Sequence, residues 1–133
     1  RLARAAGRAV ARQRVQQQLA ESERRFRSVA DSTPVLIWMR DASGRLEFVN
    51  RAWMDFVGTT DADDSTDAWQ ALLHPHDRDA YVAALLDCLR TATPFTGEVR
   101  VRHASGEWRW VASYGAPRLD ADGRCQGMVG SSV

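Results

Sequence analysis

The sequence lacks the features that mark several common classes of protein. Its 133 residues include only two cysteines, Cys88 and Cys125, and these do not form a CxxC pair. Neither a disulfide framework nor a zinc site is therefore expected. No apolar run approaches the ~20 residues that a membrane-spanning helix needs, and the sequence shows no secretory signal. We expect a soluble protein of the reducing cytoplasm.

Groups for catalysis or metal binding are also scarce. The three histidines are His74, His76 and His103, and no serine or cysteine lies in a glycine-flanked elbow. Without a nucleophile beside a base, we do not expect an enzyme. His74 and His76 lack a third ligand, so no metal site is predicted. Pro75 and Asp77 instead indicate the start of a helix.

Charge is distributed unevenly along the chain, although the net charge is only +1. Residues 1–30 hold eight arginines against two glutamates, which gives +6, and the remainder holds ten arginines against fifteen acids, which gives −5. We therefore divide the chain into an N-terminal segment, 1–30, and a domain, 31–133. The sequence begins without methionine and stops on a strand-like segment, 129–133, so we expect a piece of a longer protein.

The N-terminal segment predicts one long helix. It contains no proline and one glycine, and it consists mainly of Ala, Arg, Gln, Leu and Glu, which are strong helix formers. Five positions follow the spacing of a coiled-coil seam, namely Val15, Leu19, Ser22, Phe26 and Val29. Two interpretations stay open, a solvated helix or the stem of a parallel homodimer. The interleaved Gln and Ala do not suggest a nucleic-acid partner, and the arginines suit a membrane only as the flank of an upstream span.

The C-terminal third predicts three antiparallel strands. Residues 95–103 alternate apolar and charged side chains, which is typical of a half-buried strand. The turn 104–106 reverses the chain into a second strand at 108–114. The turn 119–124, rich in Asp and Gly, leads to a third strand at 125–133.

The middle of the chain predicts two strands and then short helices. Proline at position 34 ends the first helix, and strands are expected at 35–39 and 46–49. Asn50 is expected to cap the helix that follows it, because Asn is among the best N-cap residues.

A polar loop at 58–67 precedes two further helical segments. The first is expected at 68–73, and the second starts at Asp77, which we expect to cap it, and ends near Arg90. The buried stripe of the second helix comprises Tyr81, Val82, Leu85, Leu86 and Leu89.

The succession of elements and their residues resembles a PAS domain, in particular the subgroup common in bacterial sensor kinases. The matching residues occur in order along the chain: Ser22 to Arg27, Ile37-Trp38, Asp41, Gly44, Phe48 to Trp53, Phe56-Val57-Gly58, Trp69, His74 to Arg78, Glu98-Val99-Arg100, Gly106, Arg109-Trp110, Gly115-Ala116-Pro117, Asp122-Gly123 and Gly127. The resemblance implies an α+β fold. Its five-stranded antiparallel sheet would have the order 2-1-5-4-3, with short helices folded over one face to enclose a small pocket.

The resemblance also implies which side chains face that pocket. They are Leu36, Trp38, Phe56, Leu73, Tyr81, Leu85, Val99, Val101, Val111, Ser113, Met128 and Ser132, with Gly130 beside them. Several of them are bulky, so we expect a small or closed pocket. Neither flavin nor haem is expected as a cofactor. The reactive-cysteine motif of LOV members is missing between Gly58 and His74, and the helix body at 78–90 has no histidine.

The opposite face of the sheet is expected to carry an apolar stripe too large to leave in water. By alternation it comprises Ile37, Met39, Trp108, Trp110, Ala112 and Tyr114. Together with Val15, Leu19, Phe26 and Val29 of the N-terminal helix, this stripe is the candidate interface of a homodimer. In PAS domains the N-terminal helix often crosses this face.

By resemblance, the chain is a cytoplasmic sensory and dimerisation module of a multidomain signalling protein. The output domain would lie in the same chain, as a histidine kinase or a diguanylate cyclase regulated through the helical stem. One alternative is a ligand-free spacer that only dimerises, and another is a catalytic domain, which the scarcity of reactive groups argues against. A small molecule bound in the pocket would favour the sensory interpretation over the spacer.

Overall fold

The computed structural model describes residues 2–59 and 66–133, and the chain divides into two compact units, Arg1–Ser32 and Thr33–Val133. The polar loop predicted at 58–67 lies mostly outside the described residues. Within the described ranges, no helix combines the length and the apolar content that crossing a membrane would require.

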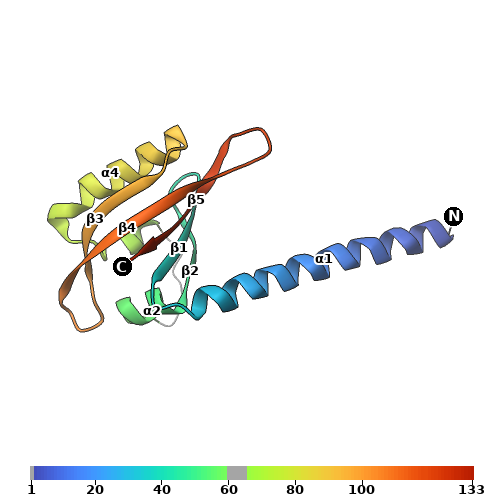
Figure 1. The fold of residues 1–133 in the computed structure, drawn as a ribbon, viewed down its shortest axis with the longest axis horizontal. Helices are drawn as coiled ribbons and strands as arrows, with labels where there is room; N and C mark the ends of the chain where they lie inside the picture. Colours follow the sequence, from blue (N-terminus) through green and yellow to red (C-terminus); the bar gives the residue numbers. More distant parts are fainter. Residues whose placement is uncertain (1, 60–65) are drawn as a thin grey trace. The chain divides into compact units, whose positions relative to one another are not determined.

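The first unit is the helix α1, Leu2–Asp31, drawn in blue in Figure 1. Beyond its last turn the backbone N–H of Ser32 donates to the carbonyl of Ser28, and Pro34 follows two residues later, where continued helical geometry is disfavoured. The predicted seam residues are solvent-accessible within this structure, with exposures of 54% at Val15 and 70% at Val29.

The second unit is built on one five-stranded antiparallel sheet (Figure 1). Its strands are β1 Leu36–Asp41, β2 Leu46–Val49, β3 Phe95–Arg102, β4 Trp108–Leu119 and β5 Cys125–Ser132. Their order across the sheet is β2-β1-β5-β4-β3. The predicted α+β class and strand order are therefore confirmed.

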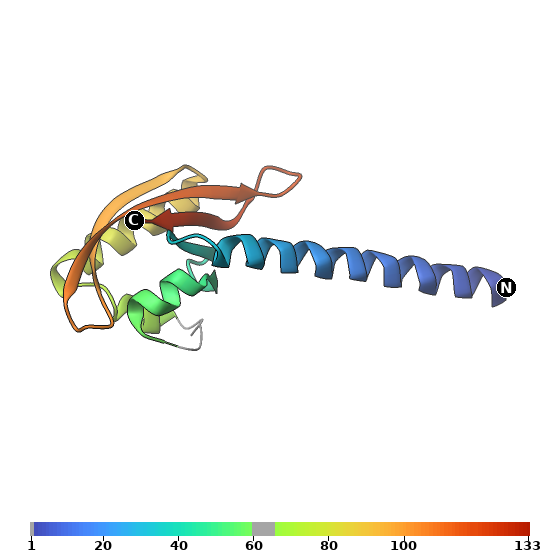
Figure 2. The same cartoon turned by 60° about the horizontal axis from the view of Figure 1, so that its bottom comes forward.

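In the described residues between the second strand and the third, the structure has three helices. They are α2 Arg51–Val57, α3 Thr66–Gln70 and α4 Pro75–Thr91. Helix α4 contacts β3 and β5, and helix α2 contacts β1, so both cover the sheet, as the turned view in Figure 2 shows. The left-handed Gly58 ends α2, where its backbone N–H donates to the carbonyl of Met54.

The helical segment predicted at 68–73 differs in the structure. Helix α3 ends at Gln70, and the residues after it run along the free edge of β3. The N–H of Arg102 donates to the carbonyl of Leu72, and the N–H of His74 donates to the carbonyl of Arg100. An open strand edge presents unpaired backbone groups. These hydrogen bonds satisfy some of them, and the residues that make the bonds are therefore not part of helix α3.

The core lies between the sheet and the helices. Its most completely buried side chains are Phe95, Leu85, Met128, Val99 and Asn50. Two glycines make room for the indole of Trp38, because a Cβ at Gly130 would overlap that ring and a Cβ at Gly115 would lie 2.9 Å from it. Trp38 is paired with Gly130 in the sheet register, and Gly130 is paired with Gly115, so the ring lies across three neighbouring strands.

Candidate functional site

A cavity of about 40 Å³ lies between the sheet and the helices. Its wall is formed by Leu36, Trp38, Arg40, Trp53, Phe56, Val57, Trp69, Leu72, Leu73, Tyr81, Val99, Val101, Val111, Ser113 and Ser132. A small-molecule site typically needs ~300 Å³ or more, whereas one water needs only ~10–15 Å³. The volume of the cavity is therefore sufficient for only a few atoms.

The structure brings together all but two of the residues that were predicted to face the pocket. The exceptions are Leu85 and Met128, which are fully buried in the core but do not line the cavity. Met128 lies over Gly115 on the neighbouring strand, where its sulfur occupies the space that a Cβ would need. Leu85 lies one helical turn beyond Tyr81, whose hydroxyl reaches the cavity wall in its place.

A chain of hydrogen bonds runs through the polar part of the wall. The indole Nε1–H of Trp38 donates to Ser132 Oγ at 3.1 Å, and the Tyr81 hydroxyl donates to Ser113 Oγ at 2.9 Å. The two serine hydroxyls lie 2.8 Å apart and share a further hydrogen bond. Burial raises the pKa of Tyr81, so its hydroxyl stays protonated and able to donate.

Arg40 is the functional candidate that the sequence analysis missed. Its side chain is 5% exposed and belongs to the cavity wall. The guanidinium carbon lies 3.8 Å from the ring centre of Trp69 and 5.0 Å from that of Trp38, and Nη1 donates to the carbonyl of Gly44. Burial lowers the pKa of Arg40 to about 10, so the group remains charged at neutral pH. Leu36 and Trp38 lie on the helix side of β1, and the same alternation places Arg40 on that side. The sequence pattern could therefore have predicted that Arg40 faces the cavity.

Two donors at this site have no partner among the described residues. They are Nε of Arg40 and Nε1 of Trp69, and both atoms are buried. Buried donors in proteins are nearly always paired, because an unmade hydrogen bond in the interior costs free energy. These two donors would therefore be expected to have a hydrogen-bond acceptor, and the described residues do not supply one.

Asn50 fixes the position of β1 relative to α2. Its Oδ1 accepts from the backbone N–H of Trp53 at 3.1 Å, which confirms the predicted N-cap. The same oxygen accepts from the N–H of Ile37 at 3.0 Å, and Nδ2 donates to the carbonyl of Val35 at 2.9 Å. One buried amide thus ties the start of a helix to the strand that carries Trp38.

The family profile for the PAS fold matches residues 46–132. The chain belongs to the PAS fold family. Its sheet order and the cavity beneath its helices are those that the resemblance implied.

Known proteins similar to this PAS domain include signalling proteins. An uncharacterized protein of Sinorhizobium fredii, y4lL, is 34% identical over 92% of the chain, and the two-component sensor PprA of Pseudomonas aeruginosa is 32% identical over 80% of it. The chain spans only 15% and 12% of these two proteins. The solved structure of a sensory box histidine kinase/response regulator from Burkholderia thailandensis matches with a TM-score of 0.60 and 26% identity, over 82% of each chain.

An ion pair joins the start of α4 to the edge strand of this PAS domain. Arg100 donates from Nε and Nη2 to the two carboxylate oxygens of Asp77, each at 2.8 Å, and its backbone N–H donates to the same carboxylate at 3.0 Å. These hydrogen bonds hold the pKa of Asp77 well below its usual range. The predicted capping role of Asp77 is therefore wrong. The N-cap is His74, whose Nδ1 accepts from the N–H of His76.

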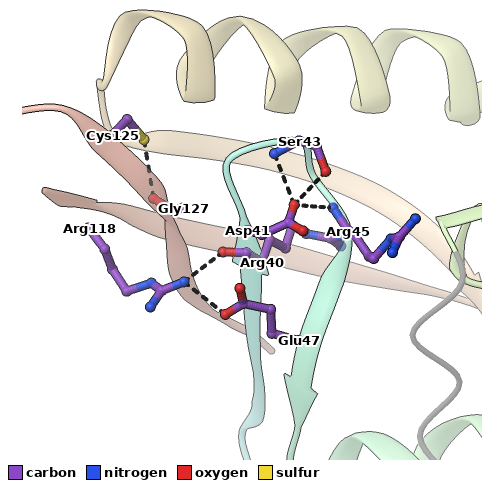
Figure 3. A network of polar contacts seen from close by, with 8 residues as sticks. All are labelled: Arg40, Asp41, Ser43, Arg45, Glu47, Arg118, Cys125 and Gly127. Carbon is purple, nitrogen blue, oxygen red and sulfur yellow. Dashed lines mark hydrogen bonds and ion pairs between the residues drawn. The ribbon is translucent and has the colours of Figure 1, made fainter. Parts of the chain in front are cut away.

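The hairpin between β1 and β2 is held by side chains on both sides (Figure 3). Asp41 Oδ1 accepts from the backbone N–H groups of Ser43 and Arg45, which closes the turn. Arg118 donates from Nη2 to the carbonyl of Arg40 and to Glu47, both at 3.0 Å. The backbone of Arg40 is thus held by a side chain from β4, which lies beyond β5 in the sheet.

The outer face of the sheet carries aromatic side chains. Trp110 is 62% exposed, and Trp108 and Tyr114 are 42% and 54% exposed, whereas Ile37 and Met39 are half-buried. The guanidinium of Arg100 lies 4.9 Å from the ring centre of Trp110. Among the described residues, no group of three or more His, Cys, Asp or Glu side chains is placed to hold a metal ion.

Proposed function

We propose that the chain is a cytoplasmic sensory and dimerisation module of a multidomain signal-transduction protein, with a histidine kinase as the output domain in the same chain. The observation that carries this proposal is the partly polar cavity between the sheet and the helices of a PAS domain. The similarity to a two-component sensor of which the domain spans only 12% supports an output domain elsewhere in the parent protein.

The sensory site in this proposal is the cavity beneath the helices. It admits only a small ligand at its present volume of about 40 Å³. Flavin and haem are not assigned to it, because the chain lacks the reactive cysteine motif between Gly58 and His74 and a histidine in residues 78–90.

Native mass spectrometry of the purified chain tests the sensory part. A small molecule that repeatedly copurifies, and that is lost when the cavity is filled by Ser113→Leu, supports sensing. Repeated absence of any ligand, together with failure to bind small probes, would favour the ligand-free spacer, an interpretation that the small cavity volume also suits.

We propose that the second copy of this chain covers both the helical seam and the aromatic sheet face. Leu19 and Val29 on the helix are 65% and 70% exposed, and Trp110 on the sheet is 62% exposed. Large exposed apolar side chains mark interaction surfaces, and a symmetric homodimer buries each such patch on both copies.

Sedimentation equilibrium tests the dimer with two charge substitutions on α1. Leu19→Glu lies on the seam and should weaken dimerisation, because the charge would be buried between the helices. Val10→Glu is the matched control, since Val10 is exposed on the same helix but lies outside the seam positions. A protein that is monomeric at high micromolar concentration, or equal weakening by both variants, would overturn the proposed interface.

A further inference from the structure

We propose that the cavity binds a small carboxylate anion of formate to acetate size, held by Arg40 and by the indole N–H of Trp69. This inference rests on the proposed sensory function and names the chemical class of its ligand.

Among the described residues, no carboxylate pairs with the charge of Arg40. The residue is 5% exposed, and none of the ion pairs between described residues includes it. Burying a charge is costly unless it is paired and hydrogen-bonded. The rings of Trp38 and Trp69 lie near the guanidinium and attract its charge, but they accept no conventional hydrogen bond from its edges. An anion in the cavity would supply the missing counter-charge.

The cavity wall has more donors than acceptors. Arg40 Nε–H and Trp69 Nε1–H have no protein acceptor among the described residues. The two serine hydroxyls share a single bond with each other and receive bonds from Trp38 and Tyr81. Whichever serine donates to the other, the accepting serine keeps an O–H that these hydrogen bonds do not use. Three unused donors therefore belong to residues of one cavity wall.

A carboxylate matches this donor surplus. Its two oxygens offer about four acceptor sites and no donor, and a guanidinium edge recognises it in the plane of the group. A neutral amide of the same shape has N–H donors of its own, and the cavity wall already has donors without acceptors. The site therefore discriminates between acetate and acetamide, which have nearly the same size.

Volume limits the ligand to a few atoms. A cavity of about 40 Å³ exceeds the ~10–15 Å³ that one water needs by roughly threefold, so it suits a ligand of three or four non-hydrogen atoms. Leu36, Leu73 and Val101 supply an apolar part of the wall, where a methyl group would lie.

The test is a titration of the ¹⁵N-labelled chain followed by NMR. Sodium acetate is added against sodium chloride at constant ionic strength, and the resonances of Arg40 Nε–H and Trp69 Nε1–H are observed. Saturable shifts of both resonances with acetate, and no saturation with acetamide or chloride, are expected. Equal shifts with acetamide, or no saturation with acetate, would overturn the carboxylate assignment.

Variants separate binding from folding. Arg40→Gln should weaken acetate binding at least about tenfold, as expected for the loss of a charge-assisted hydrogen bond. Arg45→Gln in the same hairpin is the matched control, because Arg45 is exposed, and it should stay within about twofold of the unmodified chain. Trp69→Phe keeps an aromatic ring but removes Nε1–H, and it should weaken binding while circular dichroism shows the native fold. Unchanged affinity in both Arg40→Gln and Trp69→Phe would contradict the proposal.

The outcomes also distinguish this inference from the sensory function. If acetate does not bind but a neutral small molecule occupies the cavity, the carboxylate class is wrong and the sensory proposal stands. If no probe binds and no small molecule copurifies, both proposals fail together.

Discussion

Replacing Asn50 with alanine tests whether one buried amide joins helix α2 to strand β1. The side chain is fully buried, and its hydrogen bonds to backbone groups include one from Trp53, one from Ile37 and one to Val35. Alanine removes all three, so the expected cost is larger than that of an ordinary N-cap.

The magnitude follows from these bonds. Loss of the cap to Trp53 costs about 1 kcal/mol in typical proteins. Each of the two strand bonds, to Ile37 and Val35, contributes about 1 kcal/mol more. The expected loss in unfolding free energy is therefore about 3 kcal/mol, which lowers Tm by roughly 12 °C for a domain of about 100 residues.

Urea unfolding of the purified variants measures this loss. Asn50→Ser is the control, because serine caps helices well but is too short to keep both strand bonds. Asn50→Ser should therefore cost about 2 kcal/mol, roughly 1 kcal/mol less than Asn50→Ala. A cost below about 1 kcal/mol for Asn50→Ala would refute the reasoning, since the residue would then be no more than a cap.

Two further predictions address other contacts of the PAS domain. Asp77 has a depressed pKa because of Arg100, so its contribution to stability is present above about pH 4 and is lost as pH falls below that value. The difference in urea midpoint between the unmodified chain and Asp77→Asn should narrow as pH is lowered from about 6 to about 3, and a constant difference would show that the ion pair does not contribute. Gly130→Ala would force a Cβ into the Trp38 indole and should cost about 1–3 kcal/mol. Ser131→Ala, at the next position, should stay within about 0.5 kcal/mol, and equal costs for the two variants would contradict the close packing.

Much of the fold could be predicted from the sequence because local signals and the global pattern agree. The alternation in residues 95–103, the turn at 104–106 and the Asn50 cap each act over a few residues. The sheet order could be predicted only from the resemblance, because strands that are distant in the sequence pair through contacts that no local pattern records. Most cavity residues likewise followed from the resemblance, which implied the side chains that face the pocket.

Other features depended on long-range contacts and were missed for that reason. Asp77 precedes a helical stretch and therefore satisfies the local rule for a cap, but Arg100, 23 residues later, supplies a stronger partner. Leu72 and Leu73 fit a helical spacing, but in the structure their backbone pairs with the open edge of β3. In both cases a tertiary contact outweighs a local preference.

Arg40 was missed for a different reason. Alternation along β1 places it on the same side as Leu36 and Trp38, and the structure agrees with that placement. The rule that charged residues stay in water argues against burial, so the two rules conflict at this position. Packing does not resolve the conflict, because an apolar side chain of similar size would fill the space without an unpaired charge. A residue that breaks a local rule obeyed by its neighbours is expected at a position that function constrains. Under the carboxylate proposal, the buried arginine is explained by its ligand rather than by the packing of the domain.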